Sequence, residues 1–479
     1  MNGILKKSFS NIAYKGCNVI YPMLTSAYIS RVFMAEGVGQ VSFLINIVTY
    51  FSIAASLGIP NYALKVITAS RENKEQLKKV FSELAVLILI SSTAASFLYY
   101  CFSIVYYKND DSLLKSALAL GLIVISNSLN YDWLYEAEED YEFLAKRTLI
   151  IKIIAMFSMF LFVRTIDHIF NYCLIYAMVT VLNNFSDALF YKKYTNITIC
   201  DLNIKSHLKP VMILFAAAFA TEIYTLLDST MLGVMCPSQY LGFYSNASKT
   251  VRAVYGVVFA ATGIYNPRLG YLYGSQKFDE YKKVFQQYYN QSALFAIPAT
   301  VGIASLSKQI IIVLFGTNFS LAGETLGILA LLIIVFTLAT VFGHIPLVIY
   351  GKEKVILRAT ISGAIVNFCL NRALIPRFYH NGAAIASIIS ELIVTGILLF
   401  GSIKVVRIKI ITNDILTEII AAIVMAACLE IIKEQAKGFV SLSAVVLAGA
   451  IVYFGVVFLL NNKTIRLIVG AFYNEKRNK

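Results

Sequence analysis

Charged residues are scarce in this chain of 479 residues, where Asp, Glu, Lys and Arg together make up 14%. A soluble globular protein carries about 25% charged residues and about 45–50% apolar ones. The low charge and the 58% share of hydrophobic residues exclude an ordinary water-soluble fold. They predict a protein that crosses a membrane several times.

Motifs for metal binding, disulfides and catalysis are also missing. The 7 cysteines are scattered without CxxC spacing, and the 4 histidines are isolated. There is no GxxxxGK[ST] phosphate loop, and HExxH and GxSxG are absent. We therefore expect no enzyme activity, no cofactor and no metal. Any transport must draw on an ion gradient, the membrane potential or the substrate's own gradient.

Long apolar runs are what the chain has instead. Because a hydrocarbon core about 30 Å thick needs about 20 apolar residues per helix, the sequence predicts an all-α polytopic membrane protein with about fourteen transmembrane helices. The predicted spans lie near residues 11–33, 38–60, 81–106, 113–131, 147–165, 169–191, 208–235, 241–265, 285–314, 325–350, 355–376, 381–402, 414–432 and 440–460. The loops between them are too short for a soluble catalytic domain.

Lysine and arginine are unevenly shared between alternate loops. With a cytoplasmic N-terminus, about 30 of the 41 basic residues fall on the inner side and about 9 on the outer side. This asymmetry predicts that both termini are cytoplasmic. It also explains the net charge of +14 by topology, so we expect no nucleic-acid partner.

An internal repeat divides the chain. Three matches recur at an offset of about 204 residues. They pair Gly39 with Gly242, Gly58 with Gly263, and Lys78–Phe81 with Lys282–Phe285. The repeat predicts two pseudo-symmetric six-helix bundles, at 1–200 and 201–410, followed by two extra helices and a tail at 411–479. Parallel bundles of this kind can rock around a central site.

Polar and charged side chains form stripes on predicted apolar helices. The stretch 221–252 carries two such stripes with helical spacing, formed by Thr221, Tyr224, Thr225 and Asp228 and by Ser245, Ser248, Lys249 and Arg252. Similar stripes occur in four other spans, with Lys15 and Asn18, Ser42 and Asn46, Asn183 and Asp187, and Ser387 and Glu391. Since an ionisable group within a membrane is costly, each is a functional hypothesis. Together they predict a polar cavity.

The candidate residues fall into three groups. Basic residues that could receive an anionic substrate are Lys249, Arg252, Lys15 and Arg31. Acidic residues for ion coupling or charge balance are Asp228, Asp187, Glu222 and Glu391. Polar residues that could line the cavity are Asn18, Asn46, Tyr224, Thr225, Ser245 and Asn183. Two alternatives stay open: Lys15 and Arg31 could snorkel to the interface, and Asp228 or Glu222 could be a structural partner of Lys249 or Arg252.

Several short segments of the chain have a familiar order and spacing. They are Leu57–Ala63, Asp132–Tyr135 with Glu139 and Tyr141, Asp228–Gly233, Leu241–Tyr244, Ala247–Lys249, Asn266–Arg268, and Gly382–Ala386 with Glu391. Together these segments resemble the bacterial polysaccharide transporter family, the Wzx-type flippases of O-antigen and capsule repeat units. The chain departs from the family pattern at Glu136 and Ala137, where the family usually has Gln-Gly. The segment 132–142 is acidic, and Trp133 and Tyr135 fit an aromatic belt at a membrane–water interface.

The resemblance implies two six-helix bundles in a V shape around a cationic cavity, in the bacterial cytoplasmic (inner) membrane. The implied substrate is an undecaprenyl-diphosphate-linked oligosaccharide, moved to the outer leaflet for O-antigen, capsule or exopolysaccharide synthesis. Lys249 resembles by position the basic residue that meets the diphosphate in lipid II flippases. The implied partners are the lipid-linked glycan, the bilayer and other polysaccharide assembly proteins. The alternatives are a lipid II flippase, a cation-coupled multidrug antiporter and a membrane polysaccharide polymerase.

Overall fold

The computed structural model describes residues 2–198, 202–403 and 409–467, with side chains from residue 21 onward. Every regular element in these ranges is a helix. Among the residues in these ranges, nine helices are long and apolar enough to cross a membrane, or ten if one bent pair of helices is counted as a span. The prediction of an all-α, multi-pass membrane protein is confirmed, whereas the number fourteen stays a prediction.

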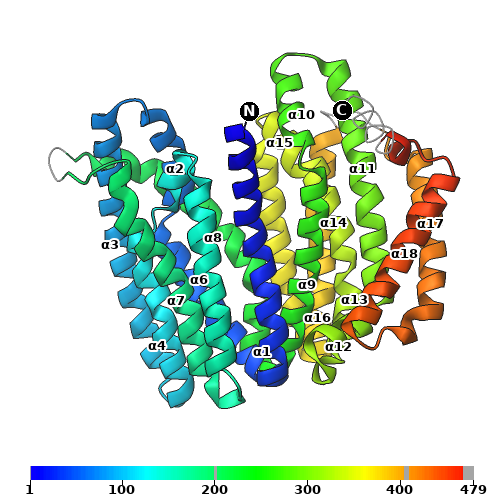
Figure 1. Cartoon of the computed structure of the whole chain (residues 1–479), viewed down its shortest axis with the longest axis horizontal. Helices are drawn as coiled ribbons and strands as arrows, with labels where there is room; N and C mark the ends of the chain where they lie inside the picture. The colour runs from blue at the N-terminus through cyan, green and yellow to red at the C-terminus, as the bar shows by residue number, and fades with distance from the viewer. Residues whose placement is uncertain (1, 199–201, 404–408, 468–479) are drawn as a thin grey trace. The chain divides into compact units, whose positions relative to one another are not determined.

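The chain divides into two compact units, Met1–Gly233 and Val234–Lys479. The first unit holds α1 (Asn2–Ser56), α2 (Ile59–Ser70), α3 (Lys74–Tyr106), α4 (Asp111–Ser126), α5 (Asp132–Ala137), α6 (Tyr141–Phe162), α7 (Ile169–Phe190) and nearly all of α8 (Ile204–Met235). Helix α1 packs against α3, α4 and α6, and α4 packs along α7 (Figure 1). The bundle boundaries at residues 200 and 410 stay predictions.

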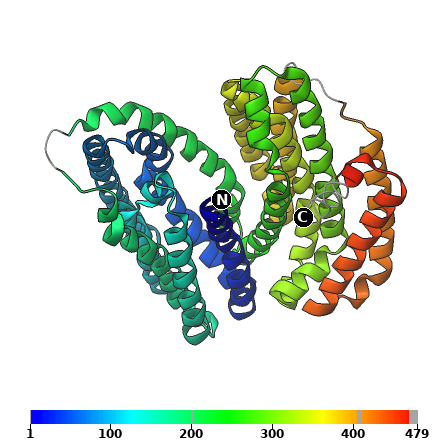
Figure 2. The same cartoon turned by 45° about the horizontal axis from the view of Figure 1, so that its top comes forward.

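The second unit continues with α9 (Ser238–Thr262), α10 (Tyr265–Gly274), α11 (Phe278–Ser305), α12 (Ser307–Phe315), α13 (Ala322–Leu329), α14 (Leu331–Ala339), α15 (Ile345–Ile349), α16 (Glu353–Ile403), α17 (Asn413–Ile432) and α18 (Phe439–Leu459). A π-helical segment, η5 (Thr340–His344), joins α14 to α15. Short 3-10 turns lie at Asn127–Leu129, Ile166–His168, Tyr191–Lys193, Thr317–Phe319 and Lys433–Gln435. Helices α17 and α18 run side by side and pack against α11 (Figures 1 and 2).

Two helices are much longer than one membrane crossing, and each contains a kink. A straight helix the length of α1 would extend about 80 Å, against a hydrocarbon core of about 30 Å. The backbone leaves helical geometry at Met34 in α1 (φ 54°, ψ −169°) and at Tyr379 in α16 (φ 47°, ψ −126°). Beside the second kink, a Cβ on Gly382 would lie 2.5 Å from the Leu374 carbonyl oxygen, so only glycine allows this approach.

Helix starts follow from local capping. The side chains of Asn73, Asp110 and Thr412 each accept a hydrogen bond from a backbone N–H in the first turn of α3, α4 and α17. Such a bond satisfies one of the amide donors that a helix start leaves without a partner. These short polar residues therefore mark where apolar helices begin.

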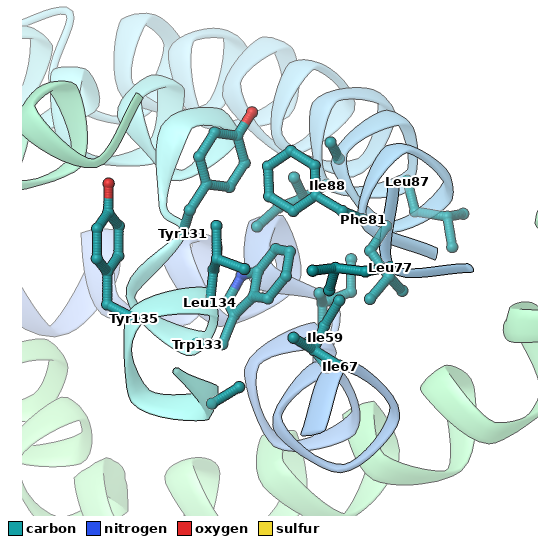
Figure 3. Packing of buried hydrophobic residues seen from close by; sticks show 14 of the residues in the cluster. Ile59, Ile67, Leu77, Phe81, Leu87, Ile88, Tyr131, Trp133, Leu134 and Tyr135 are labelled. Atoms are coloured by element: carbon teal, nitrogen blue, oxygen red, sulfur yellow. The ribbon is translucent and has the colours of Figure 1, made fainter. Parts of the chain in front are cut away.

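The core of the first unit lies where α2, α3 and α5 meet (Figure 3). Trp133, 1% exposed, packs against Phe81 and Tyr131, and its Nε1 donates to the Asn130 carbonyl at 2.9 Å. The interpretation of Trp133 and Tyr135 as an aromatic belt is wrong. Because α5 packs against α2, both rings lie inside the protein rather than at an interface.

The second unit repeats this local succession. In each unit, a long helix ends at a glycine-containing turn, which is followed by a short helix and then by another long helix. These helices are α1, α2 and α3 in the first unit, and α9, α10 and α11 in the second. The second core cluster joins Leu269 and Leu272 of α10 to Tyr281, Phe285 and Tyr288 of α11. The two clusters correspond to the two copies of the sequence repeat.

Candidate functional site

Helix α9 carries two accessible basic residues. Lys249 and Arg252 are both exposed, whereas the residues from Leu241 to Ala247 on the preceding turns are buried. A spacing of three residues places both side chains on neighbouring parts of one helix face. The arrangement presents two positive charges together, as recognition of an anion requires.

Two hydroxyl pairs fix the rotation of α9 within the second unit. The Tyr244 hydroxyl lies 3.1 Å from Ser387 Oγ on α16, and the Tyr255 hydroxyl lies 2.6 Å from Thr340 Oγ1. At 100° per residue, Tyr244 and Tyr255 share one face of the helix, and Lys249 lies about 120–140° round from it. The tyrosines therefore turn Lys249 away from the packed interior, with Arg252 between Lys249 and the tyrosine face.

The acidic candidates of α8 lie in the other unit. Asp228 is buried at 7% exposure, while Glu222, Tyr224 and Thr225 are half-buried. Helix α8 is tied to α1 by a 2.8 Å hydrogen bond between the hydroxyls of Tyr50 and Thr230. The stretch 221–252 is thus divided between the two units, and pairing of Asp228 or Glu222 with the α9 cations stays a prediction.

Asp187 is held by an ion pair inside the first unit. Its carboxylate contacts the buried guanidinium of Arg147, which also contacts Asp132 at the start of α5. Arg147 Nη1 donates as well to the Asn183 carbonyl at 3.1 Å. Of the two roles predicted for Asp187, this geometry suits charge balance.

The remaining candidates are dispersed. Asn183 joins α7 to α6 through a 3.2 Å hydrogen bond from Thr148, and buried Asn46 lies on α1. Arg31 is exposed three residues before the α1 kink. Ser245 is buried in α9 and Glu391 is half-buried in α16. The side chains of Lys15 and Asn18 lie outside the described residues.

The structure reveals a buried polar network that sequence reasoning missed. His207 Nε2 lies 2.8 Å from Glu83 Oε2, and the Tyr62 hydroxyl lies 2.8 Å from His207 Nδ1. Glu83 Oε1 accepts a 2.6 Å hydrogen bond from the Asn203 N–H. These contacts fasten the beginning of α8 to α2 and α3. The available signal was Glu83 itself, an acidic residue inside a predicted apolar span.

The second unit contains an apolar cavity of about 510 Å³ between α11, α14 and α17. Its walls include Ala296 and Ile297 of α11, Ile334 of α14, and Ile419 and Ala426 of α17. Such a lining favours a hydrocarbon chain over a sugar or an ion. Sequence reasoning did not identify it, because helices that line an apolar cavity have the same pattern as helices that face lipid.

Metal ligation finds no support among the residues that the structure describes. No group of three or more His, Cys, Asp or Glu side chains there could hold a metal ion. Cys101, Cys173, Cys236, Cys369 and Cys428 are free thiols.

Comparisons with known proteins agree with this architecture. The chain is 22% identical over 387 residues to the "Putative O-antigen transporter" of Shigella dysenteriae, covering 80% of this chain and 96% of that protein. Its fold is similar to the lipid II flippase MurJ in an inward closed conformation, with a TM-score of 0.69, 16% identity, and coverage of 97% of this chain and 100% of that one. An inward-facing multidrug resistance MATE family transporter gives a TM-score of 0.63 at 12% identity, covering 82% and 97% of the two chains.

Family models give the assignment. The MatE model matches residues 214–372. The model described as polysaccharide biosynthesis protein matches residues 4–270, more than half of the chain. The chain therefore belongs to the polysaccharide biosynthesis protein family.

Proposed function

We propose that the protein is a flippase that moves undecaprenyl-diphosphate-linked oligosaccharide repeat units across the bacterial cytoplasmic membrane. The observation that carries the proposal is the pair Lys249 and Arg252, exposed together on neighbouring positions of α9. A diphosphate is a compact anion, and lysine and arginine bind phosphate oxygens through charge-assisted hydrogen bonds. The pair would receive the diphosphate.

Two further features support a lipid-linked glycan as the substrate. The apolar cavity between α11, α14 and α17 offers a place for isoprene units next to the membrane. Polar side chains such as Asn46 and Tyr224 would solvate the sugars. Family membership and the relative's printed name point to polysaccharide synthesis, as O-antigen, capsule or exopolysaccharide.

The mechanism would be alternating access, in which two bundles rock around the substrate. With both termini cytoplasmic, the cavity would first open to the inner leaflet, where Lys249 and Arg252 would take the diphosphate. Rocking of the bundles would then expose the glycan on the outer side. No bond is made or broken, so the protein would act as a transporter and not as an enzyme.

Transport by the purified protein tests the proposal. Liposomes with and without the protein would receive an undecaprenyl-diphosphate-linked oligosaccharide with a labelled sugar. The measurement is how fast the label becomes accessible to a membrane-impermeant lectin. We expect protein-dependent acceleration; equal rates with and without the protein would contradict the proposal.

Two other functions have support and are separated by the same assay. The fold likeness to the lipid II flippase favours lipid II as the substrate, and that to MATE transporters favours drug–cation exchange. Competition by lipid II for transport would identify a lipid II flippase. Drug-dependent proton or sodium flux without glycan movement would identify a drug–cation exchanger. Sugar-specific transport of the repeat unit would exclude both.

A further inference from the structure

We propose that Glu418 on α17 is a proton-binding carboxyl that couples proton uptake to the packing of α17 and α18 against α11. The inference deepens the proposed transport function, on which the coupling rests, by naming the ion that the second unit binds. It depends on the buried surroundings of Glu418, its hydrogen bonds and its place beside the apolar cavity.

Glu418 is fully buried, at 0% exposure. One turn earlier on the same helix lies Asp414, at 8% exposure. The segment after α18 places Asn462 beside the Asp414 main-chain carbonyl and the Glu418 carboxyl. Tyr289 of α11 and Tyr453 of α18 are the other titratable groups facing Glu418. The carboxyl is therefore enclosed by three helices and the chain that follows them.

Asp414 and Glu418 have different hydrogen-bond partners. The Asp414 carboxylate accepts from the Lys463 N–H at 3.1 Å, from Thr464 Oγ1 at 2.8 Å and from Asn290 Nδ2 at 3.4 Å. These donors stabilise an ionised Asp414, which caps the segment that begins at Asn462.

The Glu418 carboxyl accepts fewer and longer hydrogen bonds than the Asp414 carboxylate does. Its Oε1 lies 3.3 Å from Asn462 Nδ2, which also donates to Thr417 Oγ1 at 2.9 Å and to the Asp414 carbonyl at 3.1 Å. Two amide hydrogens are thus shared by three acceptors, and Glu418 is the most distant. Glu418 Oε2 has no hydrogen-bond partner.

The local charge balance also disfavours an ionised Glu418. Within the part of the chain that the structure describes, no lysine, arginine or histidine forms an ion pair with Asp414 or Glu418. The neighbouring Asp414 carries the same sign of charge. A carboxylate that is buried without an opposite charge takes up a proton instead of remaining ionised.

A proton fits this site better than a metal cation. A sodium or calcium ion needs several oxygen ligands, whereas the groups that face the carboxyls are largely N–H donors. The tyrosine hydroxyls are also engaged, since Tyr289 donates to the Ile410 carbonyl and Tyr453 to the Leu294 carbonyl. Glu418 Oε2 is the carboxyl oxygen of this site that has no hydrogen-bond partner, and one oxygen is enough to bind a proton.

The position of Glu418 connects its proton to the cavity. Ile415, Ile419 and Ala422, within one turn of Glu418, line the apolar cavity together with Tyr289. Loss of the proton would place a second negative charge beside Asp414 at the junction of α17, α18 and α11. The charge would loosen that junction and change the wall of the cavity.

Infrared difference spectroscopy of the purified protein without substrate tests proton binding directly. The wild type is expected to show a protonated carboxyl band at neutral pH that disappears at alkaline pH. Glu418→Gln should lose the band, while Glu430→Gln, exposed on the same helix, should keep it. A band unchanged in Glu418→Gln overturns the proposal. If that variant does not fold, modification of wild-type Glu418 by an apolar carbodiimide, located by mass spectrometry, must fall as pH rises; pH-independent modification overturns it.

Transport measurements test the coupling separately. In liposomes, an imposed proton gradient should change the wild-type rate of lipid-linked oligosaccharide movement several-fold, and Glu418→Gln should abolish that dependence. A Glu418→Gln variant with the wild-type gradient dependence overturns the coupling. If the wild type moves no glycan at all, the proposed function fails, whereas the infrared band still decides whether Glu418 binds a proton.

Discussion

Arg147 on α6 and Asp187 on α7 form a buried ion pair, and the same guanidinium reaches Asp132 at the start of α5. One side chain thus joins three helices of the first unit. The fully buried carboxylate of Asp187 needs this positive charge, because a buried carboxylate without one is strongly disfavoured. The contact also holds α5, with Trp133, in the core of the unit.

Removal of Asp187 should therefore destabilise the first unit. We expect Asp187→Ala to reduce the stability of the protein by about 3–5 kcal/mol, since it removes the buried one of the two carboxylates that balance the buried charge of Arg147. Thermal unfolding in detergent would measure this. Asp111→Ala, which breaks the exposed pair with Lys115 on α4, should change stability by at most about 1 kcal/mol. Equal effects of the two substitutions would show that the buried pair is not structural.

The basic pair of α9 should control transport without affecting folding. Loss of a hydrogen bond to a charged group costs about 1.5–3 kcal/mol, so Lys249→Gln or Arg252→Gln should lower the transport rate roughly 10- to 150-fold. Lys249→Arg should retain most activity, because it keeps the charge. The exposed Lys65→Gln on α2 is the control. Wild-type transport by Lys249→Gln, at equal protein in the membrane, would remove Lys249 from the site.

The sequence was sufficient for the helices but not for their long-range contacts. Apolar runs predicted an all-helical membrane protein, since their pattern is local. Of the stripe predicted on α9, Lys249 and Arg252 are exposed, whereas Ser245 is buried. The kinks at Met34 and Tyr379 are at neither proline nor glycine, yet they fall in the breaks between predicted spans, 11–33 and 38–60 in one case and 355–376 and 381–402 in the other. What local spacing does not encode is which distant segments pack against each other.

The missed polar groups have the same explanation. Glu83 and His207 are 124 positions apart, and only the fold makes them hydrogen-bond partners. Glu418 lies within the predicted apolar span 414–432. The search for polar residues at helical spacing did not select Glu418, because no polar stripe surrounds it. An ionisable residue alone in a span was thus an indicator of a buried group, as Asp187 in a stripe was.

Two adjacent alanines of α17 can test the apolar cavity. Ala426 lines it, whereas Ala427 is exposed. Ala426→Phe should fill part of the cavity and slow transport of the lipid-linked substrate, because the ring occupies space that an isoprene unit would need. Ala427→Phe adds the same ring outside the cavity and should leave the rate near wild type. Equal rates for the two variants in liposomes would argue against a lipid chain in this cavity.

Asp140, at the start of α6, should make the stability of the first unit sensitive to acid. Burial acts to raise the pKa of Asp140, but hydrogen bonds from Lys193, Tyr194 and the Phe143 N–H outweigh it and hold the pKa below its usual value. A carboxyl whose pKa is lower in the folded state adds stability above its unfolded pKa of about 3.9. That contribution is lost as the pH falls through the folded pKa.

Asparagine in place of Asp140 isolates the charge, because the amide oxygen of the new side chain could still accept the capping hydrogen bond of α6. Asp140→Asn should lower the melting temperature at pH 7 and should flatten its fall between about pH 5 and pH 2. Asp110 caps α4 in the same way but has no ion pair among the described residues, so Asp110→Asn should have a smaller effect at pH 7. Melting curves of the three proteins across this pH range measure the difference. Identical acid profiles for the wild type and Asp140→Asn would show that the contacts of Asp140 with Lys193 and Tyr194 add no stability.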